Sequence, residues 1–134
     1  LVFRGANTGL DELTTTDANQ VWLVSGGAVV ETAFDARESL GMASSSIEDL
    51  AGGEAAENAA VARDVLSGGG ADAVRDAVAL NVGAGILAWE GLENPVTHSD
   101  FEPRMRGAVE RALAALADGS GARLIERWVA ASNA

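Results

Sequence analysis

Two adjacent carboxylates near the start of the chain, Asp11 and Glu12, are the residues whose type and spacing best suit a chemical role. They follow Gly9 and Leu10, a few residues after the short apolar run 1–3. Mg²⁺ prefers oxygen ligands, takes one or two carboxylates from a protein and fills its other positions with water or substrate phosphate. The pair therefore predicts a magnesium site on a loop at the end of a strand.

An ordinary solvated acidic turn is the alternative, and spacing alone favours it. Against it, the two acids lie between the apolar residues Leu10 and Leu13, close to a strand end. Like charges repel there and a cation relieves the repulsion, which is only about 1 kcal/mol at about 4 Å in water and rises with partial burial. The hydroxyl run 14–16 that follows would either orient metal-bound water or simply form the next strand.

The composition excludes several other chemistries. The chain has 134 residues, which fits one domain, and it is 48% apolar and 22% charged. Its net charge of −11 repels phosphate backbones, so neither nucleic acid nor an anionic membrane surface is expected as a partner. The absence of cysteine excludes disulfides, thiolate metal sites and cysteine nucleophiles, and is compatible with a cytoplasmic location. The longest uncharged stretch, 77–89, falls short of the roughly 20 residues of a membrane span.

Four other features have a structural and a functional interpretation. His98, the only histidine, lies in a loop and is expected at the surface. Asn81, within an apolar segment, is expected to be a core amide bonded to a neighbouring loop, because buried polar groups usually have partners. Gly52-Gly53 precedes a helix whose acidic first turn would repel a phosphate, so a glycine-built helix entrance is the better interpretation. Arg4 would offer a cation to the acidic pair, touch a phosphate or form a surface salt bridge.

The strand signals come first along the chain. Residues 20–25 and 28–34 are rich in β-branched and aromatic side chains, and Gly26-Gly27 between them predicts a β-hairpin. Residues 35–53 are expected to form a connecting loop with a short helical turn at 46–50. Strands followed by helices indicate an α+β piece or part of a larger α/β domain.

Four helices are predicted, at about 54–67, 72–89, 100–118 and 121–131. The second is apolar on nearly every side and is expected to be the most buried element. The third and fourth have apolar faces that are expected to pack inward, formed by Met105, Val109, Ala112 and Leu116 in one and by Leu124, Ile125, Trp128 and Val129 in the other. Three strands give little sheet for four helices to cover, which suggests that elements of a longer protein are missing.

Several segments, taken in order, carry a family resemblance. They are VFRG at 2–5 with GLDELTT at 9–15, DLAGGEAAENA at 49–59, VRDAVALN at 74–81 and LIERWV at 124–129. This ordered set resembles anthranilate phosphoribosyltransferase, and the last segment looks like the actinobacterial form of the family's final helix. The family often has a histidine where Arg4 stands, and a shorter, more acidic link in place of residues 6–8.

The resemblance implies a fold and a reaction. Residues 1–134 would be the C-terminal portion of the large α/β domain, of the nucleoside-phosphorylase-like fold. The helical domain, through which the family dimerises, and the glycine-rich pyrophosphate-binding loop would lie earlier, in a missing N-terminal part. The complete cytoplasmic enzyme would transfer phosphoribosyl from phosphoribosyl pyrophosphate to anthranilate in tryptophan biosynthesis. Asp11 and Glu12 would bind Mg²⁺, with no catalytic or substrate-binding residue carried over.

If the transferase interpretation holds, the isolated chain would be inactive, because most of the active site would be absent. Two other functions stay open from the sequence. A nucleoside phosphorylase relative would share the architecture, although the closing segments match it less well. A non-catalytic acidic domain would use its helices as an interaction surface.

Overall fold

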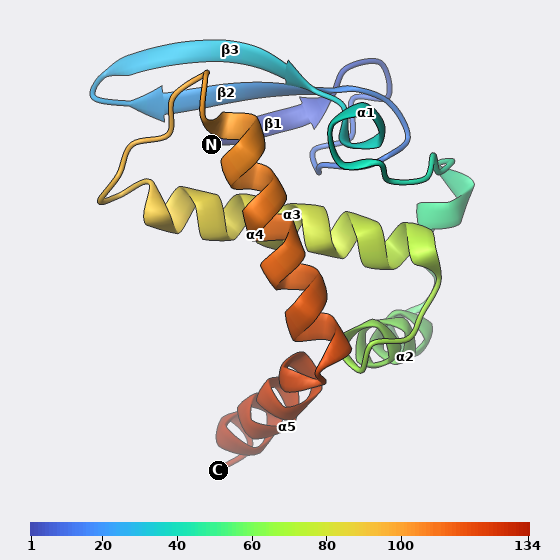
Figure 1. The fold of residues 1–134 in the computed structure, drawn as a ribbon. Coiled ribbons are helices and arrows are strands. Elements are labelled where there is room, and N and C mark those ends of the chain that lie inside the picture. The colour runs from blue at the N-terminus through green and yellow to red at the C-terminus, as the bar shows by residue number, and fades with distance from the viewer.

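The computed structural model describes all 134 residues as a small sheet packed on crossing helices (Figure 1). The sheet lies at one end, α3 and α4 cross beneath it, and α2 and α5 lie at the far end. The elements in chain order are β1 (Val2–Gly5), β2 (Asn19–Ser25), β3 (Ala28–Phe34), α1 (Ala36–Leu40), the 3₁₀ turn η1 (Glu48–Leu50), α2 (Ala55–Leu66), α3 (Asp72–Glu90), α4 (Phe101–Ala117) and α5 (Ser120–Ser132).

The sheet is antiparallel, with strand order β1-β2-β3. The predicted hairpin is confirmed: β2 and β3 pair from Ser25 opposite Ala28 to Asn19 opposite Phe34. Gly26 and Gly27 both have positive φ, 56° and 78°, which is the backbone that a two-residue hairpin turn requires and that glycine adopts without strain. The connection from β1 to β2, residues 6–18, carries the acidic pair.

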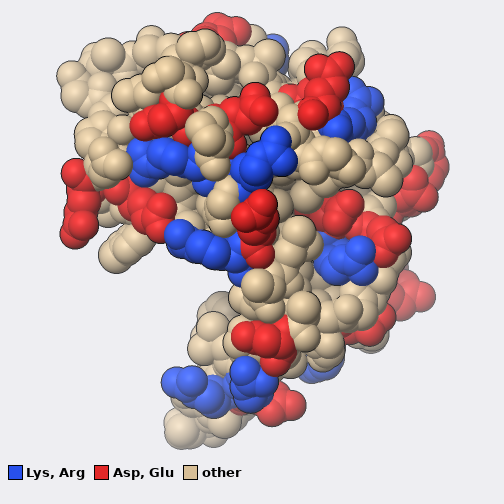
Figure 2. Space-filling model, viewed as in Figure 1, with Lys and Arg blue, Asp and Glu red and all other residues tan.

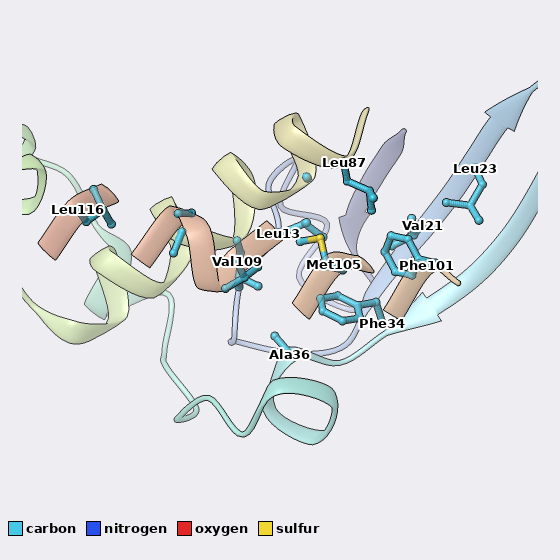
Figure 3. Packing of buried hydrophobic residues seen from close by; sticks show 14 of the residues in the cluster. Leu13, Val21, Leu23, Phe34, Ala36, Leu87, Phe101, Met105, Val109 and Leu116 are labelled. Atoms are coloured by element: carbon cyan, nitrogen blue, oxygen red, sulfur yellow. The ribbon is translucent and has the colours of Figure 1, made fainter. Parts of the chain in front are cut away.

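The core lies between the inner face of the sheet and the α3–α4 crossing (Figure 3). The rings of Phe34 and Phe101 meet edge to face with centroids 5.5 Å apart, which joins β3 to the start of α4. The predicted inward face of α4 is confirmed, since all four of its residues are buried. Ala79, Leu80, Ala84 and Leu87 of α3 complete the core from the other helix.

Part of the segment predicted as a loop is helical. Helix α1 begins after Asp35, whose side chain accepts a hydrogen bond from the Arg37 backbone N–H, and ends at Gly41 with φ of 73°. It spans only five residues, too few for an apolar period to show in the sequence. The short helical turn predicted at 46–50 is confirmed as η1.

The inward packing predicted for the last helix is wrong. The side chains of Leu124 and Trp128 are 58% and 71% exposed, and α5 has no buried residue. The physical reason is position: α5 extends away from the body of the molecule and touches α2 and the end of α4 only near its own start (Figure 1). Its apolar face therefore has no element within the chain to pack against.

Helix α3 is central, but its second half is covered on one side only. Five of its residues are buried, against six in α4, so the expectation that it would be the most buried element is not met. Val82 and Trp89 of α3 are exposed. No helix of the structure combines the length and the apolar character needed to cross a membrane.

Candidate functional site

The acidic pair lies on the β1–β2 loop with both side chains exposed to solvent. Leu10 before it is half-buried, and Leu13 after it is fully buried in the core. The five ion pairs of the structure involve other acids, so the carboxylates of Asp11 and Glu12 are not neutralised by an arginine. The pair is thus free to bind a cation and lies between two anchored apolar residues.

Asn81 of α3 anchors the residue after the pair. Its Oδ1 accepts a hydrogen bond from the Leu13 backbone N–H at 3.1 Å, and its Nδ2 donates to the Leu13 carbonyl at 2.9 Å. A third bond joins Nδ2 to the Ala77 carbonyl at 2.8 Å. The predicted role of Asn81 as an amide bonded to a neighbouring loop is confirmed, and it fixes the loop beside Glu12 to the central helix.

Asp17 anchors the residues before the pair. Its carboxylate accepts hydrogen bonds from the backbone N–H groups of Asn7 at 2.6 Å and Thr8 at 3.1 Å. The chain also turns back on itself there, because the Gly5 N–H donates to the Leu10 carbonyl at 2.7 Å. Burial alone would raise the pKa of Asp17, but the bonds from Asn7, Thr8 and Thr16 outweigh it, and the pKa lies below its ordinary value of 3.8.

The hydroxyl run 14–16 forms neither a strand nor a free ligand set. Thr14 and Thr15 are buried; the Thr14 and Thr16 hydroxyls bond to each other at 2.7 Å, and the Thr15 hydroxyl bonds to that of Ser45 at 2.9 Å. Asn19, which no sequence motif marks, accepts from the Thr14 N–H and donates to the Thr14 and Phe34 carbonyls. These threonines therefore hold the loop in place.

The role of Asp17 gives a pH-dependent prediction. Because its pKa is lower in the folded chain than in the unfolded chain, Asp17 stabilises the fold above pH 3.8, and this stability is lost as the pH falls through the folded-state pKa. Asp17→Asn should lower the free energy of unfolding by about 1–3 kcal/mol at pH 7, since the loop N–H groups lose a charged acceptor. Urea titrations should show this difference shrinking below pH 3.8. A difference that does not change with pH would contradict the assignment.

The other candidate residues lie apart from the pair or are already bonded. Arg4 donates from Nε to the Gln20 side chain at 3.0 Å and forms no ion pair. The N–H of Gly53 is taken by the Asn58 side chain at 2.8 Å, which supports the structural interpretation of that helix entrance. His98 is exposed, as predicted. Arginines lie scattered among acids on the face in Figure 2 and form no single basic patch there.

The donor set of the site is small. No group of three or more histidine, cysteine, aspartate or glutamate side chains converges anywhere in the structure. Two adjacent carboxylates are the number that a Mg²⁺ site completed by water and substrate phosphate needs. Glu12 also lines a hollow of about 520 Å³ beside α3, together with Leu50, Val78 and Val82.

Comparison with known proteins supplies the family. The model of the glycosyl transferase family, a/b domain, matches residues 1–122. The chain belongs to this family. Curated family relatives named anthranilate phosphoribosyltransferase include one from Arthrobacter sp. (strain FB24), 46% identical over 97% of the chain, and one from Nocardia farcinica (strain IFM 10152), 43% identical over 99%. The resemblance seen in the ordered motifs is confirmed.

A solved structure confirms the fold of this family member. The anthranilate phosphoribosyltransferase from Saccharomyces cerevisiae, in complex with 4-fluoroanthranilate, superimposes with a TM-score of 0.70 over 92% of the chain at 19% identity. The chain spans about a third of the proteins it matches: 35% and 38% of the two curated relatives and 33% of the yeast enzyme.

Proposed function

We propose that residues 1–134 are the metal-binding, C-terminal portion of an anthranilate phosphoribosyltransferase. The complete enzyme would transfer the phosphoribosyl group from phosphoribosyl pyrophosphate to anthranilate and release pyrophosphate, as a step of tryptophan biosynthesis. The observation that carries the proposal is the similarity over nearly the whole chain to relatives of that name. The exposed, unpaired carboxylates on an anchored loop support it.

Asp11 and Glu12 suit Mg²⁺ in type and in number. Both are oxygen donors, both are exposed and neither is engaged by an arginine. Mg²⁺ dehydrates reluctantly and is commonly held by one or two carboxylates plus substrate phosphates. Bound there, the metal would supply Lewis-acid neutralisation of the charge that develops on the departing pyrophosphate.

The chain's own residues have positioning roles in this proposal. Asp11 and Glu12 hold negative charge at a fixed place, and neither acts as a base. Asn81 and Asp17 keep the loop in one conformation before any ligand binds, which lowers the ordering cost of binding. The amine of anthranilate would attack C1 of the ribose, forming the new C–N bond as the C–O bond breaks with its electron pair on pyrophosphate, and the amine would release one proton to solvent.

We also propose what the complete enzyme contains, where it acts and what it binds. The acceptor pocket and the glycine-rich phosphate loop of the family would lie outside residues 1–134, so the isolated chain would be inactive. The complete enzyme would be a cytoplasmic homodimer whose ligands are phosphoribosyl pyrophosphate and anthranilate, with neither nucleic acid nor membrane as a partner. The net charge of −11 is in keeping with the last point.

Metal binding, measured apart from turnover, tests the assignment. In a protein of the relatives' full length, with phosphoribosyl pyrophosphate present, electron paramagnetic resonance should show Mn²⁺ binding weakened roughly tenfold or more by Asp11→Asn plus Glu12→Gln, because both direct ligand charges are lost. The matched control is Glu93→Gln plus Glu110→Gln, which removes the same charge from two other exposed acids that form no ion pair. Equal weakening by both double variants would reject the site.

Turnover by the same complete protein tests the reaction. Formation of phosphoribosyl anthranilate should require Mg²⁺ and should be lost in the Asp11→Asn plus Glu12→Gln variant but kept in the Glu93→Gln plus Glu110→Gln variant. Phosphate-dependent cleavage of nucleosides in its place would identify a nucleoside phosphorylase relative. Absence of both activities from a folded complete protein would favour an acidic interaction domain.

A further inference from the structure

Helix α3 has two apolar faces. One is covered along the helix, and the other is half-buried at its start, where Val74 and Val78 pack against the core, and open further along. Its buried residues, which include Leu80, Ala84 and Leu87, pack against α4 and the sheet. The opposite side carries a second stripe at spacings that place its members in one line along a helix, and this α3 stripe consists of Val74, Val78, Val82, Gly85 and Trp89. Val82 is 45% exposed and Trp89 is 75% exposed.

The first part of the α3 stripe, Val74 and Val78, forms one wall of a groove. Val61 and Ala62 of α2 form the facing wall, with Leu50 of η1 at one end, around a hollow of about 770 Å³. The smaller hollow beside Glu12 shares Leu50, Val74 and Val78 with it, so the two make one continuous apolar channel. The channel therefore runs from the α2–α3 end of the molecule to the acidic pair.

The charges that line the groove are all of one sign. The charged residues along the two hollows are Asp49, Glu57 and Asp64 in the larger and Glu12 in the smaller, and no arginine lines either. An apolar floor with acidic edges is complementary to a segment that is apolar along its length and carries basic residues at its flanks. A second copy of this chain, with a net charge of −11, would be a poor match.

A helix that is apolar all round belongs in a core covered on both sides. Large contiguous apolar surfaces are rarely left open on a protein that acts alone. The chain spans only 35–38% of its relatives, so about two thirds of their length lies outside the matched region. We propose that this groove is the seat of an apolar, basic-flanked segment of the complete protein outside residues 1–134. That segment lies along the α3 stripe and reaches Glu12.

This inference rests on the proposed function in one respect, that the chain is part of a longer transferase. It adds a consequence for the site: the segment that fills the groove also covers one side of the acidic pair. Both the loop of the acidic pair and the docked segment then depend on helix α3. Asn81 of α3 holds Leu13, which follows the pair, and the α3 stripe contacts the docked segment.

Single cysteines test the groove directly, because the chain has none of its own. Val82→Cys places a thiol in the groove, and Ala114→Cys places one on an exposed position of α4 whose neighbours Glu110 and Arg111 are also exposed. In the complete protein, without Mg²⁺ or substrate, Val82→Cys should react with a thiol reagent roughly 30-fold or more slowly than Ala114→Cys, because reaction requires local opening of the groove. In the 134-residue chain the two rates should agree within about threefold, since both sites are open there.

Each other outcome overturns the inference. Equal rates in a complete protein with native circular dichroism would show that the groove is open. Protection of Val82→Cys in the 134-residue chain that increases with concentration would identify a second copy as the occupant. The thiol reaction is measured without metal or substrate, so its rate does not depend on whether Asp11 and Glu12 bind Mg²⁺. Conversely, weakened Mn²⁺ binding in the Asp11→Asn plus Glu12→Gln variant does not depend on the groove.

Discussion

Replacing Asn81 with alanine should lower the free energy of unfolding by about 2–4 kcal/mol, because the Leu13 N–H and carbonyl would both lose their partner and an unsatisfied buried polar group costs about 1–3 kcal/mol. The effect should reach the site, since Leu13 directly follows Glu12. In the complete protein, Mn²⁺ binding should weaken although no ligand has been changed. Urea denaturation of the chain and electron paramagnetic resonance of the complete protein are the two measurements.

Asn58 provides a matched control. Its side chain makes the same pair of bonds, accepting from the Gly53 N–H and donating to the Gly53 carbonyl, both at 2.8 Å, but on an exposed turn. In the 134-residue chain water can replace these bonds, so Asn58→Ala should cost less than about 1 kcal/mol there. Similar losses from both substitutions would mean that the Asn81 bridge has no special role.

The parts of the fold that the sequence predicts well are those set by local patterns. The hairpin follows from two β-branched runs joined by Gly26-Gly27, and the inward face of α4 follows from apolar residues at helical spacing. Each signal is contained in fewer than about twenty residues. The acidic pair is also a local signal: its position on a loop after a strand is confirmed, and its role as a metal site stays a prediction.

The parts that the sequence does not predict depend on distant partners. The amphipathic face of α5 is evident in the sequence, but whether anything covers it depends on where the helix projects. Asp17 and Asn19 look like ordinary turn residues, and their roles appear only when the loop closes over them. Helix α1 is set by its caps, Asp35 and Gly41, and not by a period. Asn81 is predictable because a lone amide in an apolar segment requires a partner.

The close crossing of α3 and α4 should make Gly83 intolerant of a larger side chain. A Cβ at Gly83 would lie 2.7 Å from Cγ2 of Val109 and 3.1 Å from the Val109 backbone nitrogen. The Val109 side chain can rotate away but its backbone cannot, so Gly83→Val should push the helices apart. Overpacking of this kind costs about 1–3 kcal/mol and occasionally more, and we expect the upper end here. Adding Val109→Ala should recover a measurable part of the loss, as a double-mutant cycle would show.

Gly85→Val on the same helix is the control that distinguishes a steric clash between helices from a change in helix propensity. A Cβ at Gly85 meets nothing within 4 Å, so Gly85→Val in the 134-residue chain should change the free energy of unfolding by less than about 0.5 kcal/mol, the small difference in propensity between the two residues. Comparable destabilisation by both variants would contradict the close crossing as the cause. In the complete protein Gly85→Val should become destabilising, because Gly85 lies on the α3 stripe that the proposed segment covers. The glycine that faces α4 would thus be intolerant in both proteins, and the glycine on the opposite side only in the complete one.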